Sequence, residues 1–318
     1  MNKLAVITGF LGAAHNRYMV YQADRPLAAK LQLASCIPGC EGVEACYPSD
    51  FADVKELRRL LGEYGLGVAA VNFRSRRTGQ WMRGSFTSER RQERQDVVDD
   101  LRRAMDCATE LGCRRITTCP LNDGSDAPFE TDFLRMYDFA AETLVAACAH
   151  RPDVTICIEY KKNDPRQRCF FGTVGEAASF CRYVGLTNLG VTLDIGHALY
   201  AEERPAQSLA LLAKLKIPYY VHVNDNDGRW DWDMLPGTFH LWEFAEFFYA
   251  LKKVGYDNDW YAFDVFPKEI DICQNFTAAF ALTRKLEEIT GRIDRATMEE
   301  LMTERNPART IQYLYSLL

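Results

Sequence analysis

Four residues that could bind a metal ion stand at or near the ends of apolar segments in the second half of the chain. They are Glu159 in VTICIEYK, Asp194 in LGVTLDIG, His222 in YYVHVND and Asp264 in DWYAFDVF. Burying a carboxylate without a partner is costly, so a positive partner is expected beside these acids. Three carboxylates and one imidazole suit Mn²⁺, Mg²⁺ or Co²⁺ and leave coordination positions for substrate oxygens. A structural zinc site would favour thiolates, and none is placed for one.

Any one of these residues also has an ordinary explanation, because a single acid at a strand end is more often a helix cap or a solvated loop residue. Four of them in successive strand-and-helix units favour the metal site. Two further residues could assist it. His197 follows Asp194 by three positions, and Lys161 lies two residues after Glu159, on the same side of an extended strand. Lys161 could polarise a carbonyl group or neutralise the acids, and the sequence leaves both open.

Short segments rich in β-branched and aromatic residues alternate with helical segments along the chain. Their near-continuous apolar character indicates parallel strands covered by helices. Helical periodicity is clear over 53–65, 94–112 and 133–150. Glycines suited to helix C-caps stand at Gly65, Gly112, Gly185 and Gly255. The segments predicted as strands are 4–10, 42–48, 67–74, 114–121, 154–161, 189–196, 219–225 and 259–266.

Eight such units are the number that closes a (β/α)₈ barrel of about 250 residues. We therefore predict an α/β fold with a single catalytic barrel over residues 1–290. A doubly wound open sheet is the alternative, but no GxGxxG follows the first strand. Residues 291–318 are extra to the eight units, and their apolar spacing predicts a helical extension packed on the barrel or on another subunit. Chemistry in such barrels sits at the C-terminal ends of the strands, where the candidate ligands stand.

The composition is that of an enzyme-sized globular protein. The chain has 318 residues, of which 47% are hydrophobic and 26% charged, and its formal net charge is −6. No broad basic face for nucleic acid is expected, and no run of eighteen apolar residues predicts a membrane span. The eleven cysteines are scattered, with no CxxC pair, and several lie in apolar runs. Reduced, buried thiols and a cytoplasmic location are the interpretation.

Several motifs in the second half resemble the xylose isomerase-like superfamily of TIM barrels. They are IEYKKNDPR, VTLDIGHALYAEE, VHVNDNDGRWDWD, PGTFHLWEF and YAFDVFP. That group includes sugar isomerases, ketose 3-epimerases, inosose dehydratases and the endonuclease IV type of DNA repair enzyme. The resemblance implies that one Mn²⁺, or Mg²⁺ or Co²⁺, is bound by Glu159, Asp194, His222 and Asp264. It also implies that His197 contacts the substrate.

The same resemblance implies a sugar or sugar conjugate as substrate. Deprotonation next to the sugar carbonyl would give a metal-stabilised enediolate, with Glu159, Asp264, His197 and Lys161 as catalytic residues. Return of the proton to the opposite face gives epimerisation, its return to the neighbouring carbon gives isomerisation, and loss of a leaving group gives elimination. Ketose 3-epimerases use a pair of glutamates, whereas this chain has the shorter Asp264. Proton exchange on both faces of the sugar, which epimerisation needs, is therefore in doubt. Isomerisation and elimination remain open.

Aromatic and basic residues are expected at the rim of the barrel. Arg229 stands near the position of a substrate-contacting arginine of the epimerases, with an offset of about one residue. Asp225 and Asp227 could support the metal site or belong to a solvated loop. The loop after the third strand could clamp an anion or stack on a ring, or it could be exposed or contact another subunit. It carries Arg74, Arg76, Arg77, Trp81, Arg83 and Phe86, and Trp230 and Trp232 lie near the same rim. We predict that Trp81, Trp230, Arg229 and His197 bind substrate.

Two assemblies are compatible with these features. A sugar isomerase or epimerase predicts a homo-oligomer. The rim aromatics and Asp264 are also compatible with the large subunit of a bacterial C-glycoside deglycosidase, a Mn²⁺-dependent lyase paired with a small β-rich subunit. In that enzyme, loss of the C2 proton of a 3-oxo-glycoside expels the aglycone. The DNA repair relatives need three zinc ions and extra histidines after strands three and four, where this chain has NFRSR and CPLND. A non-enzymatic barrel would be expected to have lost ligands.

Overall fold

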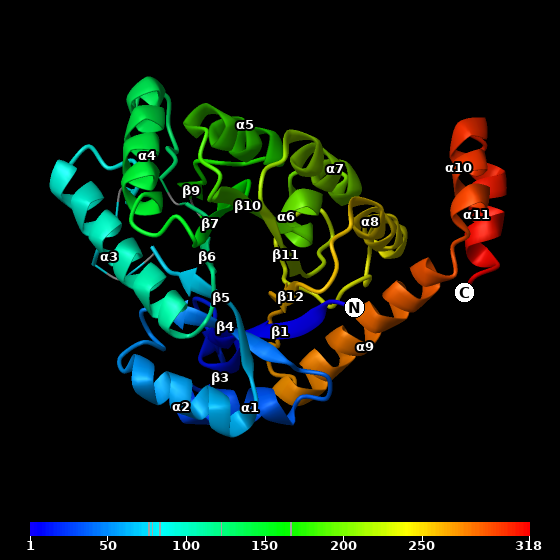
Figure 1. Cartoon of the computed structure of the whole chain (residues 1–318), viewed down its shortest axis with the longest axis horizontal. Helices are drawn as coiled ribbons and strands as arrows, with labels where there is room; N and C mark the ends of the chain where they lie inside the picture. Colours follow the sequence, from blue (N-terminus) through cyan, green and yellow to red (C-terminus); the bar gives the residue numbers. More distant parts are fainter. Residues whose placement is uncertain (76, 78, 83, 122, 166) are drawn as a thin grey trace.

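The computed structural model describes residues 1–75, 77, 79–82, 84–121, 123–165 and 167–318. Eight parallel strands form a closed barrel, so the predicted (β/α)₈ fold is confirmed (Figure 1). Neighbouring strands around the barrel follow the order β1-β12-β11-β10-β7-β6-β5-β4. Their bounds are β1 Lys3–Ile7, β4 Gly42–Tyr47, β5 Gly67–Phe73, β6 Arg115–Thr118, β7 Thr155–Glu159, β10 Leu189–Asp194, β11 Tyr219–Val223 and β12 Trp260–Phe263.

Helices surround the barrel and bury their apolar faces against the outer side of the strands (Figure 1). Local sequence signals set their ends. The Asp53 side chain caps α2 by accepting from the backbone N–H groups of Lys55 and Glu56, and Gly65 ends the helix with a φ of 66°. The helices of the barrel are α1 Leu27–Cys36, α2 Val54–Tyr64, α3 Arg91–Glu110, α4 Phe133–Cys148, α5 Val174–Val184, α6 Ile195–Tyr200, α7 Pro205–Leu215, α8 Leu241–Val254 and α9 Ile272–Gly291.

Each segment predicted as a strand overlaps one barrel strand, and the predicted helices 53–65, 94–112 and 133–150 correspond to α2, α3 and α4. Short elements decorate the ends of the strands. A 3-10 turn, η1 Thr8–Leu11, follows β1 directly. Two small hairpins are formed by β2 Ala14–His15 with β3 Val20–Gln22, and by β8 Asn163–Asp164 with β9 Gln167–Arg168.

The interior of the barrel is filled by a separate cluster of mostly small side chains. It contains Ala5, Ile7, Cys46, Ala69, Ala70, Cys157, Tyr220 and Ala262. Because successive side chains of a strand alternate in direction, the residues two positions after Cys157, Tyr220 and Ala262 face the same interior. Those residues are Glu159, His222 and Asp264. The barrel itself therefore aligns three of the four predicted ligands at its C-terminal end.

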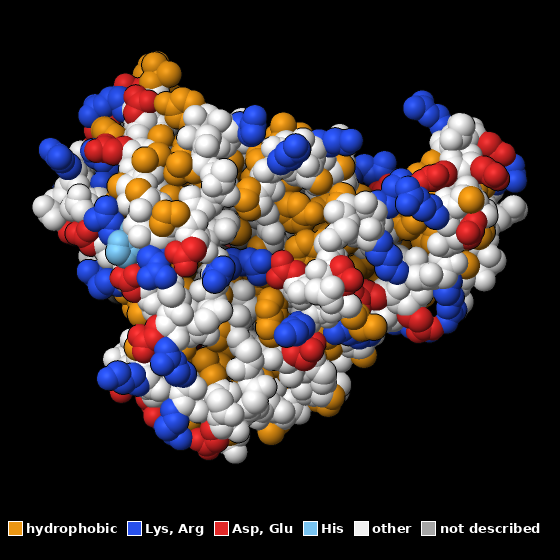
Figure 2. All heavy atoms as spheres, in the orientation of Figure 1, with side chains coloured by type: hydrophobic (Ala, Val, Ile, Leu, Met, Phe, Trp, Pro, Cys, Tyr) orange, Lys and Arg blue, Asp and Glu red, His pale blue; other side chains and the backbone are white. Residues whose placement is uncertain are grey.

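Two helices, α10 Arg295–Glu304 and α11 Pro307–Tyr315, follow α9. They project to one side of the barrel (Figure 1). Trp242 of α8 contacts Tyr315 of α11 with ring centroids 5.2 Å apart. Basic and acidic side chains are mixed over the visible surface (Figure 2). Within the described residues, no helix is both long and apolar enough to cross a membrane.

Candidate metal centre

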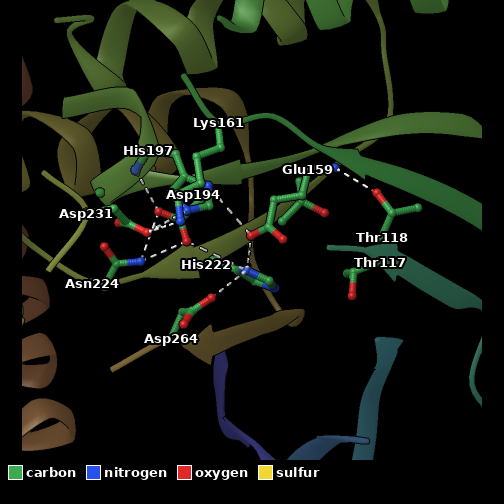
Figure 3. A network of polar contacts seen from close by, with 12 residues as sticks. Thr117, Thr118, Glu159, Lys161, Asp194, His197, His222, Asn224, Asp231 and Asp264 are labelled. Atoms are coloured by element: carbon green, nitrogen blue, oxygen red, sulfur yellow. Dashed lines mark hydrogen bonds and ion pairs between the residues drawn. The ribbon is translucent and has the colours of Figure 1, made fainter. Parts of the chain in front are cut away.

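The four predicted ligands come together at the C-terminal end of four neighbouring strands, β7, β10, β11 and β12 (Figure 3). One ligand atom from each of Glu159, Asp194, His222 and Asp264 can be chosen so that all lie within 4.8 Å of one another. Three of the four are buried, and the Asp264 side chain keeps 17% of its surface exposed. This is the geometry of a single-ion site with one side open toward the mouth of the barrel.

His222 is held from both ends of its ring. Its Nδ1 lies 2.9 Å from Oε1 of Glu159, 3.7 Å from Oδ2 of Asp194 and 4.0 Å from Oδ2 of Asp264. Its Nε2 lies 3.0 Å from Oε2 of Glu44. A carboxylate at Nε2 keeps the proton of a neutral imidazole on that nitrogen, so the lone pair of Nδ1 is directed at the three acids.

Glu44 was not singled out in the sequence, although it is completely buried in the middle of β4. Besides His222, its carboxylate accepts hydrogen bonds from Asn72 Nδ2, at 2.6 Å, and from Thr117 Oγ1. Burial alone would raise the pKa of Glu44, but the charge of His222 and these hydrogen bonds lower it. The available signal was an acid inside the otherwise apolar strand GVEACY, at a position that alternates into the barrel.

Asp194 is fixed by backbone and amide donors. Its Oδ1 accepts from the backbone N–H of His197, which caps α6, and both carboxylate oxygens accept from Asn224 Nδ2 at 2.9 and 2.8 Å. Gly196 makes room for this clamp, since a Cβ there would lie 1.6 Å from Asn224 Oδ1. Asn226 Nδ2 also bonds the carbonyl oxygen of Gly196. The motifs DIGH and HVNDN thus lock together around one ligand.

Asp264 differs from the other acids because none of the described residues donates a hydrogen bond to it. Burial, followed by the charges of Asp194 and Glu159, raises its pKa to about 7. The pKa of Asp194 is also raised, first by burial. Glu159 is the exception: burial would raise its pKa, but the charge of His222 and its hydrogen bond lower it. Three crowded carboxylates with an imidazole form a donor set that fits a divalent cation, which would remove this repulsion.

His197 lies beside the four ligands and is paired with a residue that the sequence analysis missed. Its Nε2 is 3.3 Å from Oδ2 of Asp231, while its Nδ1 is buried without a hydrogen bond and lies 3.8 Å from Oε1 of Glu159 (Figure 3). Burial would lower the pKa of His197, but Asp194 and Asp231 raise it to about 9. The β11–α8 loop that carries Asp231 follows no strand pattern, so only the folded chain identifies this pair.

Lys161 lies at the site, and its ammonium group forms ion pairs with two acids. Its Nζ lies 2.6 Å from Oδ2 of Asp231 and 3.1 Å from Oδ1 of Asp164. These ion pairs favour the neutralising role over polarisation of a carbonyl group. Nearby Asp233 has a pKa raised well above the usual value by burial and by the charges of Asp231 and Asp264. The charge of Lys161 is therefore shared by Asp231 and Asp164, while crowding by Asp231 and Asp264 disfavours the ionised form of Asp233.

The residues expected at the rim have partners other than the four ligands. Arg229 is exposed, and its backbone N–H bonds Asp227. The Trp230 ring packs edge-on against Tyr200 at 5.5 Å, and Trp81 packs under the guanidinium of Arg77 at 4.9 Å. In the described part of the chain, no hydrogen bond, ion pair or ring contact joins Arg229, Trp81 or Trp230 to the four ligands, so their substrate contacts remain predictions.

Other loop residues have structural roles or fall outside the description. Asp225 is buried and bonds the backbone N–H groups of Phe239 and His240, so it anchors the start of α8. Asp227 accepts from Trp232 Nε1 at 2.8 Å in an exposed turn, as expected for a solvated loop. Phe86 is buried in the core. Arg76 and Arg83 lie outside the described residues.

The comparisons with known proteins agree with this fold. A family model described as the xylose isomerase-like TIM barrel matches residues 31–283. The xylose isomerase of Thermus thermophilus is 24% identical over 194 residues, which cover 59% of this chain and 50% of that protein. The chain thus matches about half the length of that relative.

Solved structures show the same architecture. A 3-keto-D-glucoside 4-epimerase from E. coli has 17% sequence identity and a TM-score of 0.67, with 90% of this chain and all of that chain covered. An L-ribulose 3-epimerase has 21% identity and a TM-score of 0.67, covering 92% of this chain and 96% of that one. At these identities the likeness concerns the fold. The family model extends over most of the chain, and the protein belongs to the xylose isomerase-like TIM barrel family.

Proposed function

We propose that this protein is a divalent-metal-dependent sugar isomerase or epimerase that removes a proton next to a sugar carbonyl. The observation that carries the proposal is the convergence of Glu159, Asp194, His222 and Asp264 within 4.8 Å at the mouth of the barrel. The sugar epimerases and isomerases among the relatives support it. Mn²⁺ is the preferred ion, with Mg²⁺ or Co²⁺ as alternatives for a site dominated by carboxylates.

A divalent cation bound by these residues would act as a Lewis acid toward the carbonyl and hydroxyl oxygens of a ketose and so acidify the C–H bond between them. Asp264 is the best-placed general base, because its carboxylate is partly exposed and receives no hydrogen bond from the described residues. Glu159, in contrast, is 2.9 Å from His222 and almost fully buried. Asp264 would thus serve as the base through its exposed side, besides its role as a ligand.

The remaining residues around the site orient the sugar and exclude water. His197 is buried beside Glu159 and is oriented by Asp231, so it can hold a sugar hydroxyl in place. With a single free carboxylate, proton return to the neighbouring carbon on the same face needs no second base. This arrangement favours 1,2-isomerisation over epimerisation, which requires a donor on the opposite face.

Elimination from a 3-oxo-C-glycoside is the second candidate. A cavity of about 500 Å³ is lined by Trp232, Phe239, Phe266 and Asp233, and the charges of Asp233 and Asp264 interact. Such an apolar cavity could hold an aromatic aglycone beside the base. The name of the E. coli relative, a 3-keto-D-glucoside 4-epimerase, supports an oxidised glycoside as substrate. This candidate also predicts a small partner subunit, whereas an isomerase predicts a homo-oligomer.

The test is deuterium exchange in D₂O, followed by NMR, with the Mn²⁺-loaded protein. The panel comprises D-fructose, D-tagatose, D-psicose, L-ribulose and a 3-oxo-C-glycoside. Exchange into a free ketose that is lost in Asp264→Asn and kept in the control Asp227→Asn supports isomerase or epimerase chemistry. Release of the aglycone with inert ketoses supports elimination. Exchange that continues unchanged in Asp264→Asn, or after the metal is chelated, contradicts the proposal.

A further inference from the structure

The wall of the barrel opposite the metal ligands carries one charged group at the same height. The ligands occupy the ends of β7, β10, β11 and β12. On the other four strands, the interior positions continue two residues beyond Ile7, Glu44, Asn72 and Thr117. Ile7 belongs to the interior cluster, and Asn72 and Thr117 bond the buried Glu44 inside the barrel. The positions two residues farther on are Gly9, Cys46, Arg74 and Cys119.

Arg74 extends across the end of β4 toward β1. Its backbone N–H bonds the carbonyl oxygen of Tyr47, so the pairing of β5 with β4 continues to this residue. Its Nη2 donates to Cys46 Sγ at 3.5 Å, and a Cβ on Gly9 would lie 3.2 Å from the same Nη2. The guanidinium therefore lies over the end of the barrel between two small residues and does not extend outward into the loop.

Arg74 lacks the partners that occupy its neighbour Arg77. Arg77 pairs with Asp100 and lies over the rings of Phe73 and Trp81, at 5.4 and 4.9 Å from their centroids. No carboxylate among the described residues forms an ion pair with Arg74, although the charge of Asp264 acts on it, and the one hydrogen bond of its guanidinium within that set goes to the thiol of Cys46. A guanidinium has five N–H donors, so most of those of Arg74 are available to a ligand in the barrel mouth.

The charges at the C-terminal mouth of the barrel indicate the kind of ligand that it binds. With a divalent cation bound and His222 neutral, the three carboxylates leave one excess negative charge. The ionised Glu44 beside His222 adds a second negative charge, and Arg74 supplies one positive charge on the opposite wall. An anionic substrate would add to the negative charge of this desolvated site, whereas an uncharged sugar would not. Lys161 does not alter this balance, because it is shared by Asp231 and Asp164.

We propose that Arg74 is a substrate-binding residue that donates hydrogen bonds to hydroxyl or carbonyl oxygens of an uncharged sugar, on the side away from the metal ligands. This inference rests on the proposed function and narrows its substrate class to sugars without phosphate or carboxylate groups. The small residues Gly9, Cys46 and Cys119 leave the space between the two walls for the carbon chain or ring.

Isothermal titration of the Mn²⁺-loaded protein tests the inference without requiring turnover. The ligands are D-fructose, D-tagatose, L-ribulose and a 3-keto-D-glucoside, with D-fructose 6-phosphate as the charged counterpart of D-fructose. We expect Arg74→Met to weaken binding of the uncharged sugar by about tenfold to one hundredfold, since a charged donor is lost. Arg74→Lys should recover part of this loss, and the control Arg77→Met should bind sugar like the parent. The affinity for Mn²⁺, measured in the same samples, should be unchanged or higher in Arg74→Met.

Other outcomes would overturn the inference. Unchanged sugar affinity in Arg74→Met, or failure of every uncharged sugar to bind the parent protein, removes Arg74 from the substrate site. Tighter binding of D-fructose 6-phosphate than of D-fructose, lost in Arg74→Met, would make Arg74 an anion site. A parallel loss of Mn²⁺ and sugar affinity would make it a structural residue. Sugar binding without deuterium exchange would instead contradict the proposed function and leave the Arg74 assignment intact.

Discussion

The two halves of the barrel mouth use their strand ends in opposite ways. On β7, β10, β11 and β12, every strand end presents an acid or a histidine, and two of these side chains, Asp194 and His222, are held by Asn224, Glu44 and the backbone of α6. On β1, β4, β5 and β6, the equivalent positions are glycine, two cysteines and Arg74. The strand ends of β7, β10, β11 and β12, here called the metal wall, carry the candidate ligands and their hydrogen-bond partners, whereas those of β1, β4, β5 and β6, here called the substrate wall, carry mostly small side chains. Under the proposed function, the metal wall would supply the chemistry and the substrate wall would accommodate the sugar.

The largest effect on metal affinity should follow from Asp194→Asn, which removes one charged ligand from the metal wall. Asparagine can still cap α6, so the fold should be retained with a loss of at most about 1 kcal/mol. Affinity for Mn²⁺ should fall by more than about one hundredfold, and exchange activity should be lost with it. Calorimetric titration with Mn²⁺ and the melting temperature measure the two effects separately. Undiminished Mn²⁺ affinity would show that Asp194 is only a helix cap.

Glu44→Gln tests whether the substrate wall also supports the metal wall, because Glu44 reaches from β4 to His222. Glutamine keeps the volume but can no longer hold the His222 ring with a charge. We expect Mn²⁺ affinity to fall by about tenfold to one hundredfold, as for other residues that orient a metal-bound histidine. The exposed Glu63 offers a control, since Glu63→Gln removes the same charge far from the site. Equal Mn²⁺ affinity in the two variants would contradict the positioning role.

Two glycine substitutions test how well each wall tolerates an added methyl group. In Gly196→Ala the new methyl group meets Asn224 Oδ1 at 1.6 Å, so the clamp on Asp194 must move, and we expect a loss of about 1–3 kcal/mol in unfolding free energy. In Gly9→Ala the nearest atoms are the ends of the Arg74 and Cys46 side chains, at 3.2 and 3.4 Å, which can shift. Its effect should stay below about 1 kcal/mol. Chemical denaturation measures both, and equal losses would refute the difference in tolerance.

The smallest effect concerns pH in the metal-free protein. The pKa of Asp264 is raised to about 7, above its unfolded value, so the folded state binds more protons between about pH 4 and pH 7. The unfolding free energy of the protein should therefore fall as pH rises through this window. The same measurement on Asp264→Asn gives the contribution of all other titrating groups, which is subtracted. Saturating Mn²⁺ should remove the difference, since a cation favours the ionised carboxylate. Denaturation curves at several pH values provide the measurement, and identical pH dependence of the two proteins would show that Asp264 is not crowded.

Much of the site could be predicted from the sequence because the barrel repeats a simple rule. An apolar strand followed by a polar residue places that residue at the C-terminal mouth, and this rule located Glu159, Asp194, His222 and Asp264. It did not locate Asp231, because that residue lies in a long loop with no regular pattern. Asn224, inside the recognised motif HVNDN, was not assigned its clamp on Asp194, since its partner lies thirty positions earlier in the chain.

The sequence by itself determined the alternation of strands and helices, the number of units and the types of the candidate metal ligands, because these depend on local periodicity and side-chain chemistry. Only the tertiary structure decided which nitrogen of His222 faces the acids, since that depends on Glu44 from a distant strand. It also distinguished two arginines of one loop, because Arg77 pairs with Asp100 whereas Arg74 lies over the end of the barrel. Side-chain direction and burial arise from the closure of the barrel, which brings together strands that lie far apart in the chain.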